Sequence, residues 1–110
     1  MKKTWSVPGL FRPDSGARTV LEREREEVIR AAARHLASNV RVFGSVARGD
    51  DGPDSDIDLL VDFAPAASLL DLIALKQELE QLLKRPTDVV TPDSVSPFMR
   101  QHILDEARPL

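Results

Sequence analysis

The chain has 110 residues, of which 42% are hydrophobic and 30% are charged, and its formal net charge at pH 7 is −3. This length supports one hydrophobic core but not two. Cysteine is absent, which excludes disulfides and thiolate metal sites, and no apolar run approaches the roughly 20 residues that a membrane helix needs. The composition therefore predicts a single globular domain in the cytoplasm, with no membrane partner.

Charge is distributed unevenly along the chain. Residues 1–20 hold four basic side chains and one acidic side chain, whereas the remainder holds 11 basic and 17 acidic ones. Binding of nucleic acid depends on Lys and Arg side chains that neutralise phosphates. The acidic body therefore argues against nucleic acid as a direct partner and suits a cation or a basic partner instead.

Residues 1–18 are interrupted by proline and glycine and show neither a helical nor a strand period. We expect them to form an N-terminal tail that precedes a domain over residues 19–110. The tail contains Trp5 and Phe11, which indicate either loose packing on the body or an arm that docks on a partner.

The domain is expected to begin with a helix over residues 19–38, because Thr19 and Glu22 have the spacing of a capping box. A strand over 40–43, a short helix over 45–49 and an apolar strand over 57–63 follow. The next helix is expected to start near Ser68 and to stop before Pro86, which cannot continue a helix. Its predicted buried stripe has leucines at helical spacing, namely Leu72, Leu75, Leu79 and Leu82.

A strand over 87–91 and a last helix complete the predicted elements. Ser96 and Pro97 are typical of a helix start, with proline at the first helical position. The side chains expected to face inward from this helix are Phe98, Met99, Ile103 and Ala107. The element order αβαβαβα predicts an α/β (α+β) fold with a small mixed sheet of about three strands covered by helices.

Two aspartates at the head of the strand over 57–63 form the main candidate site. Strand side chains alternate between faces, so Asp56 and Asp58 share one face at about 7 Å along the strand. Carboxylates placed in this way can hold a pair of divalent ions that clamp the oxygens of a phosphoryl displacement. Gly44 and Ser45 open the turn after the preceding strand, where glycine allows close approach of the backbone to a phosphate. The pattern therefore predicts a metal–triphosphate site.

The segment from Gly44 to Val61, GSVARGDDGPDSDIDLLV, resembles the signature of the polymerase-β-like nucleotidyltransferases. Within that superfamily it is most similar to the minimal, MntA-type nucleotidyltransferases, and the resemblance covers about residues 20–108. It implies a polymerase-β-like palm that transfers a nucleoside monophosphate from ATP, with pyrophosphate leaving.

The resemblance also implies which acids are catalytic. Asp56, Asp58 and Asp88, the last on the strand over 87–91, would be the catalytic carboxylates and the metal ligands. An all-oxygen ligand set suits Mg²⁺ or Mn²⁺ rather than zinc. Asp88 would in addition take the proton of the attacking hydroxyl group.

For nucleotide binding, the resemblance implies that Gly44 and Ser45 cradle the β- and γ-phosphates of ATP. Arg48 would reach the same phosphates as a fixed positive charge. The alternative for Arg48 is a surface arginine paired with Asp50 or Asp51.

MntA-type proteins are typically paired with a helical HEPN protein, an RNase toxin, and attach AMP to one of its tyrosines. The resemblance therefore implies a Mg²⁺-dependent protein adenylyltransferase that acts as an antitoxin and forms a hetero-oligomer with its HEPN toxin. Two alternatives remain open. One is an antitoxin that blocks its toxin by contact alone, and the other is a nucleotidyltransferase that acts on a small molecule or an RNA end.

Overall fold

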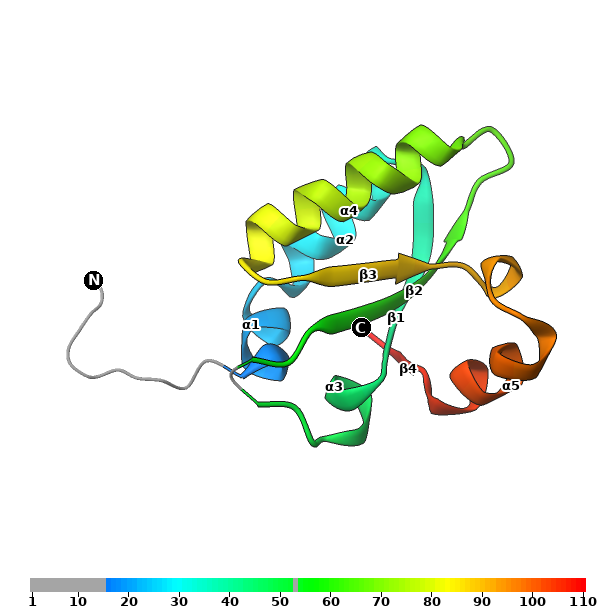
Figure 1. Cartoon of the computed structure of the whole chain (residues 1–110). Coiled ribbons are helices and arrows are strands. Elements are labelled where there is room, and N and C mark those ends of the chain that lie inside the picture. The colour runs from blue at the N-terminus through cyan, green and yellow to red at the C-terminus, as the bar shows by residue number, and fades with distance from the viewer. Residues whose placement is uncertain (1–15, 53) are drawn as a thin grey trace.

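The computed structural model describes residues 16–52 and 54–110, which fold around one four-stranded sheet in the order β3-β2-β1-β4 (Figure 1). In chain order the elements are α1 (Ala17–Arg23), α2 (Arg25–Arg34), β1 (Ala37–Phe43), α3 (Ser45–Arg48), β2 (Ile57–Phe63), α4 (Leu69–Leu83), β3 (Thr87–Val90), a 3₁₀ turn (Pro92–Ser94), α5 (Pro97–Glu106) and β4 (Arg108–Pro109). Strand β2 is antiparallel to β1 and parallel to β3, while β4 is antiparallel to β1. The predicted mixed fold is confirmed, with one strand more than expected.

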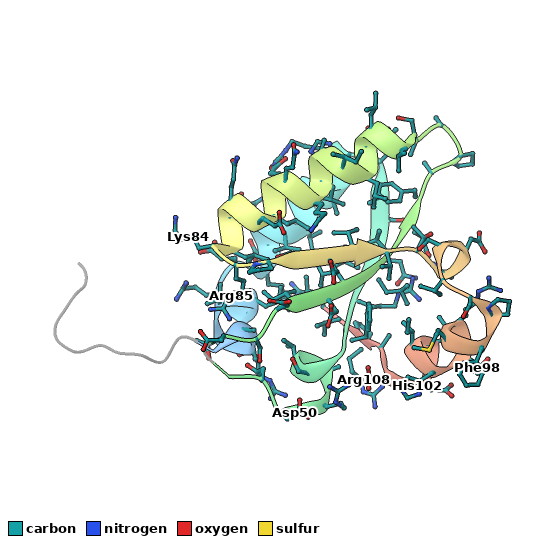
Figure 2. The ribbon with its side chains drawn as sticks, viewed as in Figure 1. Asp50, Lys84, Arg85, Phe98, His102 and Arg108 are labelled. Carbon is teal, nitrogen blue, oxygen red and sulfur yellow. The ribbon has the colours of Figure 1, made fainter. Side chains whose placement is uncertain are left out.

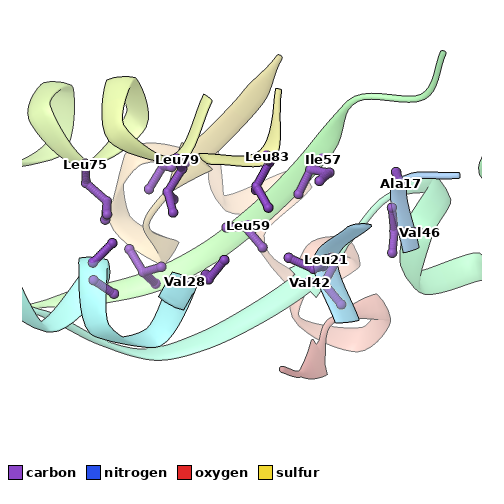
Figure 3. Close-up of a cluster of buried hydrophobic side chains, with 14 of the residues drawn as sticks. Ala17, Leu21, Val28, Val42, Val46, Ile57, Leu59, Leu75, Leu79 and Leu83 are labelled. Atoms are coloured by element: carbon purple, nitrogen blue, oxygen red, sulfur yellow. The ribbon is translucent and has the colours of Figure 1, made fainter. Parts of the chain in front are cut away.

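Helices α2 and α4 lie side by side on one face of the sheet, and the core fills the space between them and the strands (Figure 1). Leu75, Leu79 and Leu83 of α4 are fully buried and belong to one cluster with Val28 of α2 and Leu59 of β2 (Figure 3). The predicted stripe is therefore shifted at its end, because Leu83 is buried while Leu82 is only partly covered.

The predicted helix over 19–38 is wrong in its extent. It is divided into α1 and α2 at Glu24, whose φ of −99° and ψ of 14° leave the helical range. The second helix ends at Arg34, because Leu36 takes a left-handed φ of 66° and its carbonyl accepts the N–H of Ala64 after β2. The helix therefore ends, and the strand begins, several residues earlier than the sequence pattern predicts.

Strand β1 consequently begins at Ala37 instead of residue 40. Its pairing with β2 shifts register between Ser38 and Arg41, and Asn39 in that interval has a φ of 52°. Asparagine tolerates the left-handed region better than most residues, so it accommodates such a bulge. A polar segment with a bulge lacks strict alternation, which is why the pattern did not predict a strand there.

The domain begins slightly before residue 19. Ala17 opens α1 and is fully buried, so the described end of the predicted tail belongs to the core. Trp5 and Phe11 lie outside the described residues.

Helix α5 starts at Pro97 as predicted, and the N–H of Met99 donates to the Ser96 hydroxyl at 3.3 Å. The inward face assigned to this helix is largely wrong. Phe98, labelled in Figure 2, is 86% exposed. Met99 is 44% exposed, whereas Ile103 is buried. Ile103 is the one buried residue of this helix, and among the described residues the start of the helix has little for Phe98 to pack against. None of the described helices combines the length and the apolarity that a bilayer crossing requires.

We predict that Leu79→Ala lowers the free energy of unfolding by about 2–5 kcal/mol, because it leaves a cavity between α2, α4 and β2. Leu70→Ala on the same helix is the matched control. Leu70 is 75% exposed, so its truncation should change stability by no more than about 0.5 kcal/mol. Urea denaturation measures both variants, and equal losses would contradict the described packing of α4.

Candidate active site

Gly44 joins β1 to the short helix α3 in a conformation that only glycine adopts readily, with φ 75° and ψ −151°. A Cβ atom at this position would lie 2.2 Å from Oδ2 of Asp58. The missing side chain therefore allows the end of β1 to lie directly against the Asp58 carboxylate. Gly49, with φ 83°, ends α3 in the left-handed conformation typical of a helix C-terminus.

The predicted aspartates occupy the start of β2 and the adjacent strand. Asp58 is the second residue of β2 and is half-buried, while Asp56 lies just before the strand and is exposed. In the parallel ladder, Asp58 is opposite Asp88 of β3. The sheet thus brings the third acid beside the first two, although the three are distributed over 33 positions of the sequence.

Electrostatics at Asp58 reflect this crowding. Burial raises the pKa of the Asp58 carboxyl above its ordinary value, and the charges of Asp88 and Asp56 raise it further, while Arg48 opposes them. Ionised Asp58 is therefore a source of unfavourable energy in the folded protein, which a neighbouring cation would relieve.

Asp88 has a cationic neighbour that sequence reasoning missed. Lys76 of α4 places its Nζ 3.9 Å from Oδ1 of Asp88 and donates to the Thr87 carbonyl and to Glu80, each at 2.9 Å. The Asp88 side chain is 66% exposed, so this ion pair is weak. Lys76 lies on α4, which connects β2 to β3. Its contact with Asp88 depends on how α4 packs on the sheet, so the sequence alone did not predict it.

The three aspartates offer a divalent metal ion one kind of donor. All donors are carboxylate oxygens, the ligands that Mg²⁺ and Mn²⁺ prefer. Within residues 16–52 and 54–110, no three His, Cys, Asp or Glu side chains converge closely enough to hold one ion as they stand. The donor chemistry thus fits Mg²⁺, while the described side chains do not form a closed ligand cage.

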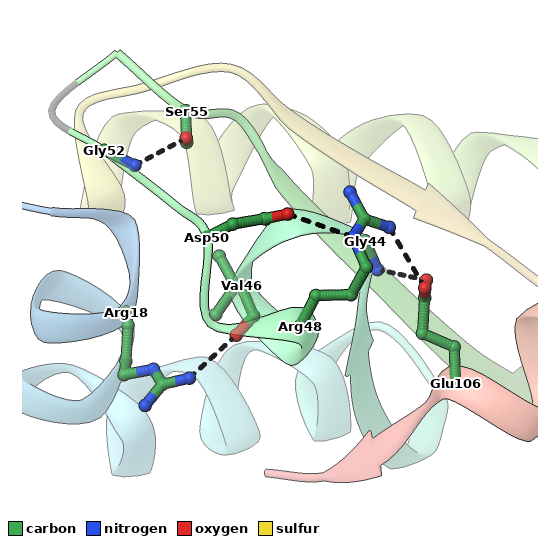
Figure 4. A network of polar contacts seen from close by, with 8 residues as sticks. All are labelled: Arg18, Gly44, Val46, Arg48, Asp50, Gly52, Ser55 and Glu106. Carbon is green, nitrogen blue, oxygen red and sulfur yellow. Dashed lines mark hydrogen bonds and ion pairs between the residues drawn. The ribbon is translucent and has the colours of Figure 1, made fainter.

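Arg48 is held by two acids. Its Nη1 lies 3.0 Å from Oε2 of Glu106, and its Nε lies 3.3 Å from Oδ2 of Asp50 (Figure 4). The predicted alternative pairing with Asp50 is therefore present. Asp51 instead accepts the backbone N–H of Arg18 at the start of α1.

Glu106 is the residue of this region that sequence reasoning did not identify. Besides contacting Arg48, it accepts the backbone N–H of Gly44 at 2.8 Å (Figure 4). Its position in the last turn of α5 was a usable signal, because a carboxylate is unfavourable at the negative end of a helix dipole unless another group binds it.

An open groove of about 370 Å³ collects most of these side chains. Its lining residues are Phe43, Gly44, Ser45, Arg48, Asp56, Asp58, Met99, His102, Ile103 and Glu106. Five of the six predicted site residues therefore line one groove, and Asp88 lies outside its lining on the neighbouring strand. Met99 and His102 of α5 form a further part of the wall, which the sequence analysis did not assign to the site.

The sequence matches nucleotidyltransferase domains over most of its length. A family model described as a nucleotidyltransferase domain matches residues 25–110. Protein MJ0435 of Methanocaldococcus jannaschii, provisionally named a protein adenylyltransferase, is 41% identical over 83 residues, which cover 76% of this chain and 89% of the relative. The protein adenylyltransferase MntA of Thermococcus cleftensis is 36% identical over 88 residues, which cover 76% of this chain and 89% of MntA.

Solved structures agree with these relatives. A structure provisionally named a minimal nucleotidyltransferase superimposes with a TM-score of 0.76 at 47% identity, covering 84% of this chain and 95% of the other. A chain from a toxin–antitoxin complex of MntA superimposes with a TM-score of 0.63 at 25% identity, covering 81% of this chain and 70% of the other.

We predict that Gly44→Ala destabilises the fold by at least about 2 kcal/mol, because it adds backbone strain and a clash with the Asp58 carboxylate. Gly52→Ala is the control, since no atom of the described residues lies within 4 Å of a Cβ at that position. Chemical denaturation of both variants checks the expectation. If the two substitutions cost the same, the close contact between Gly44 and Asp58 does not exist in solution.

We predict that Asp58→Asn raises the melting temperature at pH 7–8 in the presence of EDTA. Because the folded state raises the pKa of Asp58, ionisation of this group lowers stability above the ordinary aspartate pKa of about 3.9, and fully so above the raised value. The gain should therefore shrink as the pH falls through the raised pKa and disappear below the ordinary one. Asp54→Asn, which removes an exposed carboxylate, should show no such profile. A melting temperature that is lower than the parent's at pH 8 would contradict the prediction.

Proposed function

The chain belongs to the nucleotidyltransferase domain family, as a minimal nucleotidyltransferase, and on this basis we propose that it transfers AMP from ATP to a tyrosine hydroxyl of a cognate HEPN-type RNase toxin. The observation that carries the proposal is the groove that Gly44, Ser45 and Arg48 line together with Asp56 and Asp58. In the proposed reaction the hydroxyl oxygen forms a bond to the α-phosphorus of ATP. The bond from that phosphorus to the bridging oxygen breaks, and pyrophosphate leaves.

The proposed roles of the nucleotide-binding residues follow from their donors. The Gly44 N–H, the Ser45 hydroxyl and the Arg48 guanidinium would donate to oxygens of the β- and γ-phosphates. Positioning and electrostatic stabilisation account for most of the rate in phosphoryl transfer, since the protein has little covalent chemistry to perform. Arg48 suits this role because it contributes a fixed charge and planar donors.

The proposed roles of the acids follow from their place at the sheet. Asp56 and Asp58 would hold Mg²⁺ or Mn²⁺, with Asp88 completing the ligand set. When bound, the ion would neutralise charge that develops on the triphosphate oxygens. Asp88 would accept the proton of the attacking hydroxyl, because its exposed carboxylate is open to an incoming acceptor.

A protein acceptor is supported by the relatives, by a similar chain in a complex and by the surface of α5. Relatives that match along most of the chain are named protein adenylyltransferases, and a similar chain occurs in a toxin–antitoxin complex. In addition, α5 exposes Phe98 and Met99 next to the groove, which Met99 also lines. An apolar surface beside a catalytic groove suits docking of a protein whose hydroxyl group must reach the site.

Neutralisation by contact alone is the second candidate function. It is favoured by the pairing of Glu106 with Arg48 and with the Gly44 N–H, because an internal carboxylate occupies two of the groups assigned to the triphosphate. A variant that keeps the surface for the partner but lacks the carboxylates of Asp56 and Asp58 distinguishes AMP transfer from neutralisation by contact.

We predict that the double variant Asp56→Asn, Asp58→Asn folds normally and still binds its toxin, but loses AMP transfer by several orders of magnitude. Co-purification with the toxin measures binding, and incorporation of label from α-labelled ATP measures transfer. EDTA should abolish transfer by the parent, and Mg²⁺ should restore it. The charge-matched control Glu22→Gln, Glu26→Gln removes two exposed acids of α1 and α2 and should retain activity.

The outcome in cells decides between the two candidates. If the double aspartate variant protects against the toxin as well as the parent does at equal expression, neutralisation occurs by contact and the proposed function is wrong.

A further inference from the structure

Glu106 occupies the groups that the proposed function assigns to the triphosphate. One carboxylate oxygen accepts the Gly44 N–H at 2.8 Å, and the other lies 3.0 Å from Nη1 of Arg48. This two-point contact, one backbone N–H and one guanidinium, is also the arrangement in which a phosphate oxygen pair is bound. The Glu106 side chain is only 16% exposed, so the carboxylate lies within the groove rather than on its rim.

The fold holds Glu106 in this place through β4. Val42 of β1 pairs with Arg108, and the N–H of Leu110 donates to the carbonyl of Val40 at 3.1 Å. These contacts fix the end of α5 against the end of β1, where Gly44 lies. Glu106 is the last residue of α5, so the pairing of the next residues determines its position.

Burial and hydrogen bonding act in opposite directions on the Glu106 carboxylate. Burial acts to raise the pKa of the Glu106 carboxyl, but the hydrogen bonds from Gly44 and Arg48 together outweigh it, and the pKa is lowered. The same carboxylate is close enough to Asp58 for its charge to raise the pKa of that acid. Glu106 therefore adds negative charge to a groove that already holds Asp56 and Asp58, and Arg48 compensates for it.

We propose that Glu106 is a built-in competitor of the triphosphate, whose carboxylate must leave the Gly44 N–H and Arg48 before the β- and γ-phosphates of a nucleotide can bind there. This inference rests on the proposed function, because it takes these two groups as the phosphate subsite. Its consequence is that part of the binding energy of the nucleotide is consumed in displacing Glu106. The affinity of the groove for the triphosphate is then lower than it would be without the Glu106 contact. The affinity for a nucleoside monophosphate, which lacks the β- and γ-phosphates, is unaffected.

The test compares Glu106→Gln with the parent in binding of three probes in the presence of Mg²⁺. The probes are ATP, inorganic tripolyphosphate and AMP, measured by isothermal titration calorimetry. Glutamine retains the shape of the side chain but loses its charge, and a hydrogen bond to a charged group is stronger than one to a neutral group. We expect the variant to bind ATP and tripolyphosphate roughly tenfold more tightly than the parent, with the affinity for AMP unchanged.

Asp105→Asn is the matched control, because it removes the same charge from the neighbouring residue of α5. The Asp105 side chain accepts from Gln101 and does not contact Gly44 or Arg48. It should leave the affinity for all three probes near that of the parent. An equal gain in both variants would mean that net charge, rather than occupation of the subsite, controls affinity, and the proposal would be wrong. Glu106→Ala, checked for folding by its melting curve, should show the same gain as Glu106→Gln or a larger one.

Other outcomes are equally decisive. Weaker binding of ATP by Glu106→Gln would show that Glu106 helps to hold the nucleotide, and unchanged binding would show that it does not compete; both overturn the proposal. If tripolyphosphate binds more tightly to Glu106→Gln while ATP is never transferred to a partner, the competitor role stands and the proposed function fails. If neither the parent nor the variants bind ATP or tripolyphosphate, there is no phosphate subsite, and both are wrong.

Discussion

The candidate site depends on the contact between a bare α-carbon and a carboxylate, at Gly44 and Asp58. Any side chain at position 44 would occupy the space of the Asp58 carboxylate, since its Cβ would lie 2.2 Å from Oδ2. The left-handed φ of Gly44 also directs its N–H toward α5 and starts the turn that carries Ser45 and Arg48. One residue without a side chain thus determines where the acids, the arginine and the last helix meet.

The negative charges around this contact repel one another and lower the stability of the folded protein. Asp56, Asp58 and Glu106 line the groove together with the cationic Arg48, and Asp88 has a long contact of 3.9 Å to Lys76. Such crowding is costly in a folded protein unless a ligand relieves it, and active sites commonly carry this kind of cost. Ile57, Leu59 and Val61 of β2 belong to the apolar cluster, and because strand side chains alternate, Asp58 lies on the opposite face of β2 from them. The stability contributed by this cluster offsets the cost of the crowded acids.

Local patterns in the sequence were sufficient for the part of the site that is contiguous in the chain. Gly44 and Asp58 are separated by only 14 positions, so the turn, α3 and β2 could be predicted from turn residues and apolar runs. The start of α5 followed from Ser96 and Pro97 for the same reason. The catalytic and metal-binding roles of the aspartates remain predictions.

Features that depend on distant contacts could not be predicted. Glu106 meets Gly44 across 62 positions, and β4 has two residues, too few for any alternation to be visible. The exposure of Phe98 was missed because the apolar spacing of a helix does not reveal how many neighbours it has. The break after Arg34 was missed because a left-handed Leu36 has no local sequence signal of the kind that glycine provides.

The thin attachment of the C-terminal segment has a consequence for motion. Helix α5 contributes one buried residue, Ile103, and β4 adds two residue pairs at the edge of the sheet, whereas β1 and β2 are paired along most of their length. Segments with few buried apolar contacts open with a smaller free energy than the whole domain. Residues 97–110 are therefore expected to open at a smaller free energy than β1 and β2. The same segment carries one wall of the groove, so its opening would remove that wall from beside Asp56 and Asp58.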